Sequence, residues 1–124
     1  MSILENKQIA ATVILNKADG SKRFLMHQTS EQSTLIVANV DEEKTGLANV
    51  LQVLKEKVAI DVYQLQLVEL TNGIIKDKRM PIFVFEMNEN QEMNVALPTG
   101  FTWQDPQYFM DRIAKFEVKG MPLF

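Results

Sequence analysis

The chain has 124 residues, of which 46% are hydrophobic and 23% are charged, and its formal net charge is −3 at pH 7. This length and composition are typical of a globular domain with a buried core, and they exclude a disordered chain. The sequence contains no cysteine, which excludes disulfides, thiolate catalysis and a cysteine-based zinc site. We therefore expect residues 1–124 to form a single domain.

The distribution of charge and hydropathy narrows the partners and the location of the protein. Acidic and basic residues are mixed along the chain, so no large positive field is available for a nucleic-acid backbone. No apolar run approaches the roughly 20 residues that a transmembrane helix needs. The first residues lack the basic region and long apolar run of a secretory signal. We expect a cytoplasmic protein that binds neither nucleic acid nor membrane.

The first 40 residues carry strand signals. Lys7 to Asn16 is rich in Ile, Val and Thr, Ala18 to Ser21 contains an Asp-Gly turn, and Arg23 to Gln28 returns. This pattern predicts a β-hairpin. Thr34 to Val40 is a nearly unbroken apolar run, which predicts a strand covered on both faces.

From Thr45 the hydrophobic period changes to that of a helix. Apolar residues recur at steps of three and four and predict one stripe that packs on a sheet, formed by Leu47, Val50, Leu51, Leu54 and Val58. Gln52, Lys55 and Glu56 are expected to face elsewhere. The acidic run 41–43 precedes this helix, where the positive end of the helix dipole favours negative charge.

The second half of the chain predicts two more strands and a closing helix. Alternation over Tyr63 to Leu70 predicts a strand, and Asn72-Gly73 predicts a turn after it. Ile82 to Met87 predicts a buried strand, preceded by the basic loop Lys76 to Arg79. Asp105-Pro106 has the N-cap and first-turn proline of a helix start. The inner face of that helix is expected to carry Tyr108, Phe109, Ile113 and Phe116.

Residues 38–60, an acidic loop that runs into a helix, resemble the box of the Nudix hydrolases. The family pattern is a Gly, five residues, a Glu, seven residues, Arg-Glu-aliphatic-any-Glu-Glu, one residue, then Gly-aliphatic. Laid on without gaps, its first Gly, first Glu, Arg-Glu, Glu-Glu and last Gly fall on Ala38, Lys44, Gln52-Val53, Glu56-Lys57 and Ala59. Only Glu56 and the aliphatic positions Leu54 and Ile60 fit.

The order of the predicted elements between Ile9 and Ala114 is also similar to the Nudix layout. The resemblance implies an α/β (α+β) fold, a Nudix-like α/β/α sandwich with a mixed β-sheet between helices. It also implies the chemistry of the family, in which divalent cations held by helix carboxylates assist hydrolysis of a substituted diphosphate.

The three helix positions that would hold the metal read Val53, Glu56 and Lys57. Magnesium prefers hard oxygen ligands, and glutamates at steps of three and four would line one helix face. Valine offers no ligand. The Lys57 ammonium would repel a divalent ion by several kcal/mol at a few ångströms and an effective dielectric near 20, on the order that Coulomb's law gives. The sequence therefore predicts that the ordinary metal site is absent and that no cofactor is bound.

Three hypotheses of function follow. The first is a Nudix-like domain without hydrolytic activity, a binding or regulatory module for a small nucleotide-like ligand, whose candidate ligand-binding residues are Arg23, Glu56, Lys57, Arg79 and Trp103. The second is a Nudix-type pyrophosphohydrolase that acts on nucleoside diphosphate derivatives with Mg or Mn, using the substitute carboxylates Glu42, Glu43, Glu56 or Glu69. The third is a structural module that self-associates, as a homodimer, through strand edges and methionine-rich surface.

The candidate residues also have structural interpretations, which the pattern favours. Glu56 can be a solvated helix residue paired with a neighbouring lysine, while Trp103 can anchor the closing helix. His27, the single histidine, is expected to have a structural or surface role and not to act as a general base. The methionines, among them Met26, Met80, Met87 and Met110, are expected to fill irregular gaps in the core.

Overall fold

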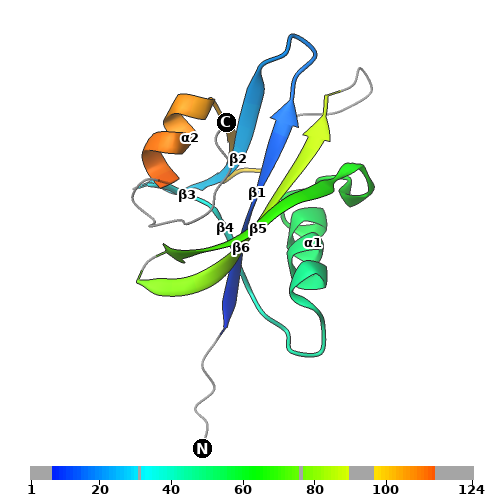
Figure 1. Ribbon diagram of the computed structural model, residues 1–124, viewed down its shortest axis with the longest axis vertical. Coiled ribbons are helices and arrows are strands. Elements are labelled where there is room, and N and C mark those ends of the chain that lie inside the picture. Colours follow the sequence, from blue (N-terminus) through cyan, green and yellow to red (C-terminus); the bar gives the residue numbers. More distant parts are fainter. Residues whose placement is uncertain (1–6, 31, 76, 90–96, 114–124) are drawn as a thin grey trace, which may run out of the picture.

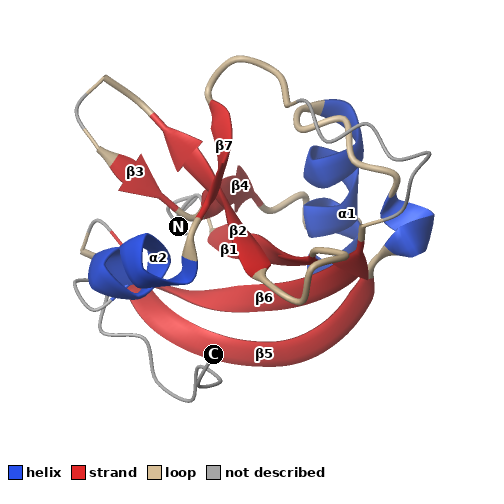
Figure 2. Cartoon of the chain, turned by 90° about the horizontal axis from the view of Figure 1, so that it is seen from above, coloured by secondary structure: helices blue, strands red, loops and turns tan. Residues whose placement is uncertain are grey.

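The computed structural model describes residues 7–30, 32–75, 77–89 and 97–113. The strands of these residues form one mixed sheet with a helix on each face (Figures 1 and 2). In chain order the elements are β1 (Gln8–Asn16), β2 (Lys22–Gln28), β3 (Ser33–Thr34), β4 (Ile36–Asn39), α1 (Gly46–Glu56), η1 (Val62–Gln64), β5 (Gln66–Ile75), β6 (Lys78–Asn88), β7 (Phe101–Gln104) and α2 (Pro106–Ile113). The strand order is β3-β2-β1-β6-β5, with β4 also paired to β1 and β7 to β2. The predicted sandwich is confirmed.

The predicted hairpin is formed by β1 and β2. The two strands are antiparallel, and Ile14 lies opposite Phe24. Gly20 in the connecting turn has φ of 89°, a left-handed conformation that glycine adopts without a Cβ clash. On its other side β1 pairs in parallel with β6, which makes the sheet mixed.

Two apolar clusters cover the two faces of the sheet. The α1-face cluster contains Ile9, Ala11, Val13, Leu15, Leu25, Ile36, Ala38, Val50, Leu54, Val58, Ile60, Phe83, Phe85 and Met87. The α2-face cluster contains Ala10, Ile14, Phe24, Met26, Leu35, Ile75, Met80, Ile82, Val84, Phe109 and Ile113. Successive strand residues alternate between the clusters because side chains of a strand point to opposite faces. Of the four methionines expected in the core, three are buried and Met110 is half-buried.

The run from Thr34 to Val40 is one apolar segment but two strands, which corrects the prediction. The chain leaves the ladder at Leu35, so that β3 pairs with β2 whereas β4 pairs with β1. Because the segment changes its neighbour, the backbone pairing is interrupted although Leu35 itself stays buried. The apolar run correctly predicted that this segment is buried, but hydropathy carries no information about which strand each half of the segment pairs with.

The turn predicted at Asn72-Gly73 is wrong. Both residues lie inside β5, where Asn72 is paired with Pro81 and Gly73 with Met80. A continuous ladder with β6 satisfies this backbone, and the tertiary pairing outweighs the local turn preference. The strand also begins later than predicted, at Gln66, because Tyr63 belongs to the 3-10 turn η1 and is exposed.

Helix α2 begins as predicted. The Asp105 carboxylate accepts a hydrogen bond from the Tyr108 N–H at 2.8 Å, and Pro106 is the first helical residue. Phe109 and Ile113 are buried, whereas Phe116 lies outside the described residues. The Tyr108 hydroxyl hydrogen-bonds the buried Ser33 hydroxyl at 2.9 Å, which ties α2 to β3. Neither α1 nor α2 is long and apolar enough to cross a membrane, and the same holds for every helix among the described residues.

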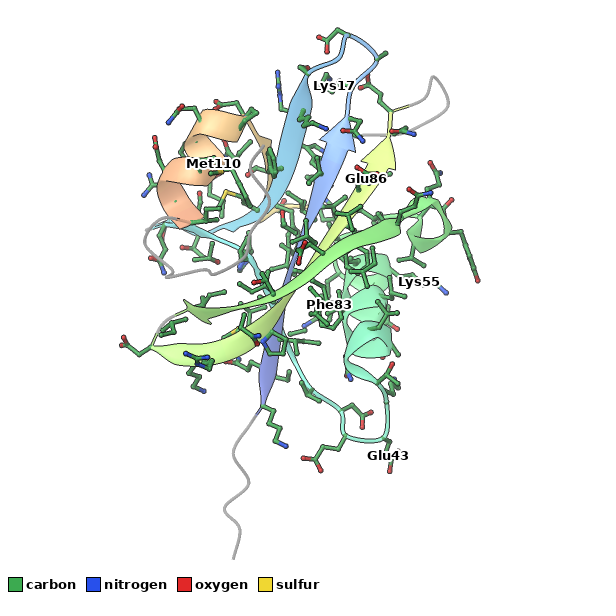
Figure 3. All side chains as sticks on the ribbon, in the orientation of Figure 1. Lys17, Glu43, Lys55, Phe83, Glu86 and Met110 are labelled. Atoms are coloured by element: carbon green, nitrogen blue, oxygen red, sulfur yellow. The ribbon has the colours of Figure 1, made fainter. Side chains whose placement is uncertain are left out.

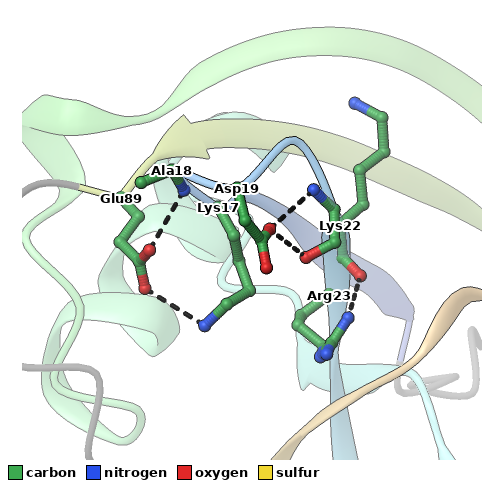
Figure 4. Close-up of polar contacts among 7 residues, drawn as sticks. Lys17, Ala18, Asp19, Lys22, Arg23 and Glu89 are labelled. Atoms are coloured by element: carbon green, nitrogen blue, oxygen red, sulfur yellow. Dashed lines mark hydrogen bonds and ion pairs between the residues drawn. The ribbon is translucent and has the colours of Figure 1, made fainter.

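One ion pair joins the turn after β1 to the end of β6 (Figure 4). The Glu89 carboxylate accepts hydrogen bonds from the Ala18 N–H at 3.1 Å and the Lys17 ammonium at 3.2 Å. Both donors favour the charged form of the carboxylate and lower the pKa of Glu89 below its ordinary value of 4.5. The Ala18 N–H has the larger effect and Lys17 the smaller. A lowered folded-state pKa stabilises the fold above pH 4.5, and this stabilisation is lost as the pH falls through the folded-state pKa.

Glu89→Gln is therefore expected to reduce the acid sensitivity of the fold. Urea denaturation at pH 7 and at about pH 3 should show a larger loss of stability in the wild type than in the variant, since the variant has no carboxylate to protonate. Glu42→Gln is the matched control, because it removes an exposed carboxylate that forms no hydrogen bond to any described residue. Equal pH dependence in wild type and Glu89→Gln would contradict the assignment.

Candidate functional site

Helix α1 lies on the sheet through the predicted stripe, with one exception. Val50, Leu54 and Val58 are buried, but Leu47 is 38% exposed. Gly46 is the first-turn residue that faces the sheet, and a Cβ on it would lie 3.3 Å from the Phe83 ring (Figure 3 shows Phe83 beside α1). Since successive residues of a helix are turned by about 100°, this close approach directs Leu47 outward.

The loop before α1 is organised by Asn49, which the sequence interpretation missed. Its side chain is buried and accepts a hydrogen bond from the Asp41 N–H at 2.9 Å. Its amide nitrogen donates to the carbonyls of Thr45 at 2.8 Å and Asp41 at 3.2 Å. The sequence feature that could have identified Asn49 is a polar residue directly beside Val50 of the apolar stripe. Asn49 fixes the path of residues 41–45 into the helix.

Three positions of the box pattern are linked by hydrogen bonds. The Lys44 ammonium donates to the Gln52 side-chain oxygen, and the Gln52 amide donates to both oxygens of the Glu56 carboxylate at 3.3 Å. The gapless alignment places the pattern's first Glu on Lys44 and its Arg on Gln52. The side chains at these two positions are therefore in contact in this chain. Glu56 is exposed as expected, but its partner is Gln52 and not a lysine.

Val53 and Lys57 differ from each other in environment. Val53 is half-buried and packs against the α1-face cluster, as do Phe101 and Trp103. Lys57 is exposed at the C-terminus of α1, where its N–H donates to the Val53 carbonyl at 2.8 Å. Ala59 follows with φ of 62°, the left-handed conformation for which the pattern's glycine is suited.

Arg23 and Trp103 lie at one end of the sheet. Arg23 is half-buried, donates to the Lys22 carbonyl at 2.9 Å (Figure 4) and is paired with Leu15. Trp103 is paired with Leu25, is half-buried and packs in the core against the α1-face cluster. Both therefore lie on the face that α1 covers. The closing helix α2 covers the other face, so Trp103 does not anchor it there. His27, in the same strand as Arg23, lies beside Phe101 with ring centroids 5.2 Å apart.

Arg79 lies at the opposite end. In the β1–β6 ladder Ala10 pairs with Ile82, so Arg79 is level with the first residues of β1, whereas Arg23 pairs with Leu15. About eight residue steps of roughly 3.3 Å separate the two levels, or some 26 Å along the sheet. The candidate ligand-binding residues thus belong to at least two separate regions.

The substitute carboxylates do not come together either. Glu42 and Glu43 are exposed in the loop before α1. Glu69 pairs with Val84, a residue of the α2-face cluster, and so lies on the opposite face of the sheet from α1 and Glu56. Across the described part of the chain, no group of three or more His, Asp or Glu residues is arranged to hold a metal ion.

A pocket of about 600 Å³ opens where β1 and β6 begin and β4 ends. Its charged lining residues are Lys7, Lys78 and Arg79, and we name it the basic pocket after these three cations. Its apolar walls include Ile9, Val40, Met80 and Pro81. No carboxylate lines it, and none of the three cations forms an ion pair with a described residue. The arrangement suits an anion that also carries an apolar group.

Comparison with known proteins identifies the fold. No protein-family model and no curated protein matches the sequence. Solved structures match over nearly the whole chain. An Ap4A hydrolase of C. elegans is 20% identical with a TM-score of 0.62, over 90% of this chain and 86% of that one. The NUDIX domain of Shewanella oneidensis NrtR complexed with ADP ribose is 13% identical with a TM-score of 0.56, over 89% and 79%.

A third match is the MutT protein of Methanosarcina mazei Go1, 15% identical with a TM-score of 0.57, over 92% of this chain and 95% of that one. The chain therefore has the α+β fold of the Nudix hydrolases. In particular it has the MutT-like arrangement, a mixed sheet between α1 and α2. The predicted fold is confirmed.

Proposed function

We propose that this chain is a Nudix-fold module that binds a small nucleotide-like anion without hydrolysing it. The observation that carries the proposal is the basic pocket. Its volume of about 600 Å³ lies within the range of roughly 300–1,000 Å³ that is typical of small-molecule sites.

The lining of the basic pocket matches two parts of such a ligand. The Arg79 guanidinium can form two parallel hydrogen bonds with a phosphate, while Lys7 and Lys78 supply compact positive charge. Val40 and Pro81, which are half-buried, offer apolar surface to a base or a ribose. Cations of the protein can neutralise a phosphate without a bound metal.

The residues on α1 argue against hydrolysis. A divalent cation needs hard oxygen donors, but Val53 offers none and is engaged in apolar packing. Lys57 adds positive charge, and Glu56 is one carboxylate that already accepts two hydrogen bonds from Gln52. We infer that this set does not fit a divalent cation. The alternative with substitute carboxylates is disfavoured because Glu69 lies across the sheet.

The ligands of structural neighbours support the choice of probe. One neighbour is a hydrolase of Ap4A, and another was crystallised with ADP ribose. Both molecules combine two or more phosphates with at least one nucleoside, which is the combination of charge and apolar surface that the basic pocket suits.

Thermal denaturation with ADP ribose and with Ap4A, in EDTA and in Mg or Mn, tests the proposal. We expect a higher Tm in EDTA, since a ligand at about 100 times its Kd stabilises the fold by about 2.7 kcal/mol. Raising the salt concentration should weaken the effect because exposed charges are screened. Arg79→Ala should abolish most of the shift, whereas Lys55→Ala, which removes an exposed lysine of α1, should leave it intact.

Two results would contradict the proposal. A Tm shift that needs metal, together with metal-dependent cleavage of either probe into two phosphorylated products, would establish the hydrolase instead. No shift with either probe, or equal shifts in Arg79→Ala and wild type, would remove the basic pocket as a nucleotide site.

A further inference from the structure

Strand β5 is the outermost strand of the sheet (Figure 2). It pairs with β6 on one side and has no described strand on the other. At ten residues it is one of the longest strands of the described chain. The N–H and C=O groups along its outer side form a template on which another strand can pair.

Exposed apolar side chains collect at this edge. Four of the five exposed large hydrophobic residues of the described chain are Tyr63 at 91%, Leu70 at 55%, Leu67 at 45% and Val68 at 42%, in η1 and the first half of β5. Leu67 and Leu70 pair with Phe85 and Phe83 of the α1-face cluster, so they extend the same face of the sheet beyond the helix. Val68 is the extra residue where the register shifts between Leu67 and Glu69.

Residues 66–75 carry little of the usual protection against pairing, namely the bulge at Val68 and the charge of Glu69. Exposed edge strands are commonly blocked by lysine, proline or inward-pointing charge. Residues 66–75 contain no Lys, Arg or Pro, and their single charged side chain, Glu69, is half-buried. Since the chain carries a net charge of −3, two copies repel each other least where the surfaces that meet carry few charges. Strand β5 provides such a surface.

We propose that a second copy of this chain pairs antiparallel with the outer edge of β5, which continues the sheet across a two-fold axis. Two identical edges match each other in this orientation, because each offers the same pattern of donors and acceptors to its mate. With the axis at Leu70, the two Leu70 side chains meet and Glu69 faces Thr71 of the partner subunit. An axis at Glu69 would oppose two carboxylates, which is unfavourable.

The size of the edge sets the strength of the pairing. Ten residues span roughly 34 Å, and a strip about 10 Å thick covers on the order of 340 Å² per copy. Stable interfaces bury about 800 Å² per partner, so the dimer is weak and reversible, with Tyr63 adding apolar area beside the strand.

Sedimentation velocity over roughly 5–500 μM, a range suited to a weak interface, tests the pairing. We expect the mass to rise from one copy, 14.2 kDa, toward twice that value. Leu70→Lys should shift this rise to at least about tenfold higher concentration, since it places charge on the axis. Gln28→Lys is the control for added charge, because Gln28 is exposed on β2, which β1 and β6 separate from β5; this variant should dimerise as wild type does.

Hydrogen exchange of the wild type is a second measurement of the pairing. It uses no variant, so misfolding of a variant cannot affect it. Amides of β5 should gain protection at high concentration, while those of α1 should not. A mass of one copy at every concentration would overturn the proposal, as would open-ended growth or equal loss in both lysine variants. Ligand-induced Tm shifts should survive in Leu70→Lys, so this test is independent of the nucleotide site.

Discussion

Phe109→Ala is expected to lower the free energy of unfolding by about 3–5 kcal/mol, the range for removing a buried aromatic ring. Phe109 is fully buried and stacks on Phe24 of β2, with ring centroids 4.2 Å apart and planes at 17°. The substitution removes the ring pair and leaves a cavity between α2 and the sheet. Domains of this size are stable by about 5–15 kcal/mol, so the loss is a large share of the total.

Urea denaturation of Phe109→Ala, Phe24→Ala and the double variant measures this effect. The coupling between the rings should be about 0.5–1.5 kcal/mol, as for other stacked pairs. Met110→Ala is the control, since Met110 is the next residue of α2 and is half-buried. If Phe109→Ala destabilised the fold no more than the control does, α2 would not be held by this ring.

Asn49→Leu is expected to lower the free energy of unfolding by about 2–3 kcal/mol. The leucine keeps the number and branching of the side-chain heavy atoms, with a larger volume, but removes the acceptor for the Asp41 N–H and the donor to the carbonyls of Thr45 and Asp41. A polar group that loses its partner while buried costs about 1–3 kcal/mol, and exposed parts of the loop recover some of this from water. Urea denaturation measures the loss.

Two further variants sharpen the interpretation. Asn49→Asp keeps an acceptor for the Asp41 N–H but brings negative charge to two carbonyl oxygens, so it should also be destabilising. Gln52→Leu, on the exposed side of the same helix, should change stability by no more than about 0.5 kcal/mol. Hydrogen exchange at the Asp41 amide should rise in Asn49→Leu and stay unchanged in Gln52→Leu.

The loss at Asn49 has a functional consequence if the proposed function holds. Val40 lines the basic pocket and directly precedes Asp41. The Asn49 side chain hydrogen-bonds both the N–H and the carbonyl of Asp41. Loosening the loop should therefore weaken the ligand-induced Tm shift as well as the fold. A variant that lost stability but kept the full shift would show that the pocket does not depend on this loop.

The sequence by itself determined the local elements and the chemistry of individual positions. The Asp-Gly turn between β1 and β2, the stripe of α1 and the Asp105-Pro106 start of α2 depend on residues within a few positions of one another, so their spacing was sufficient. The prediction that Val53 and Lys57 stand at two metal-binding positions of the box likewise came from the aligned pattern alone.

Only the tertiary structure decided which distant residues meet. The basic pocket joins the starts of β1 and β6 to the end of β4, and the strand register places Arg79 some 26 Å from the level of Arg23, by residue rise. Because β5 pairs continuously with β6, this strand runs through Asn72-Gly73, where the sequence predicts a turn. Strand order and register set these distances, and they result from the packing of the whole sheet, which the spacing of residues along one segment does not encode.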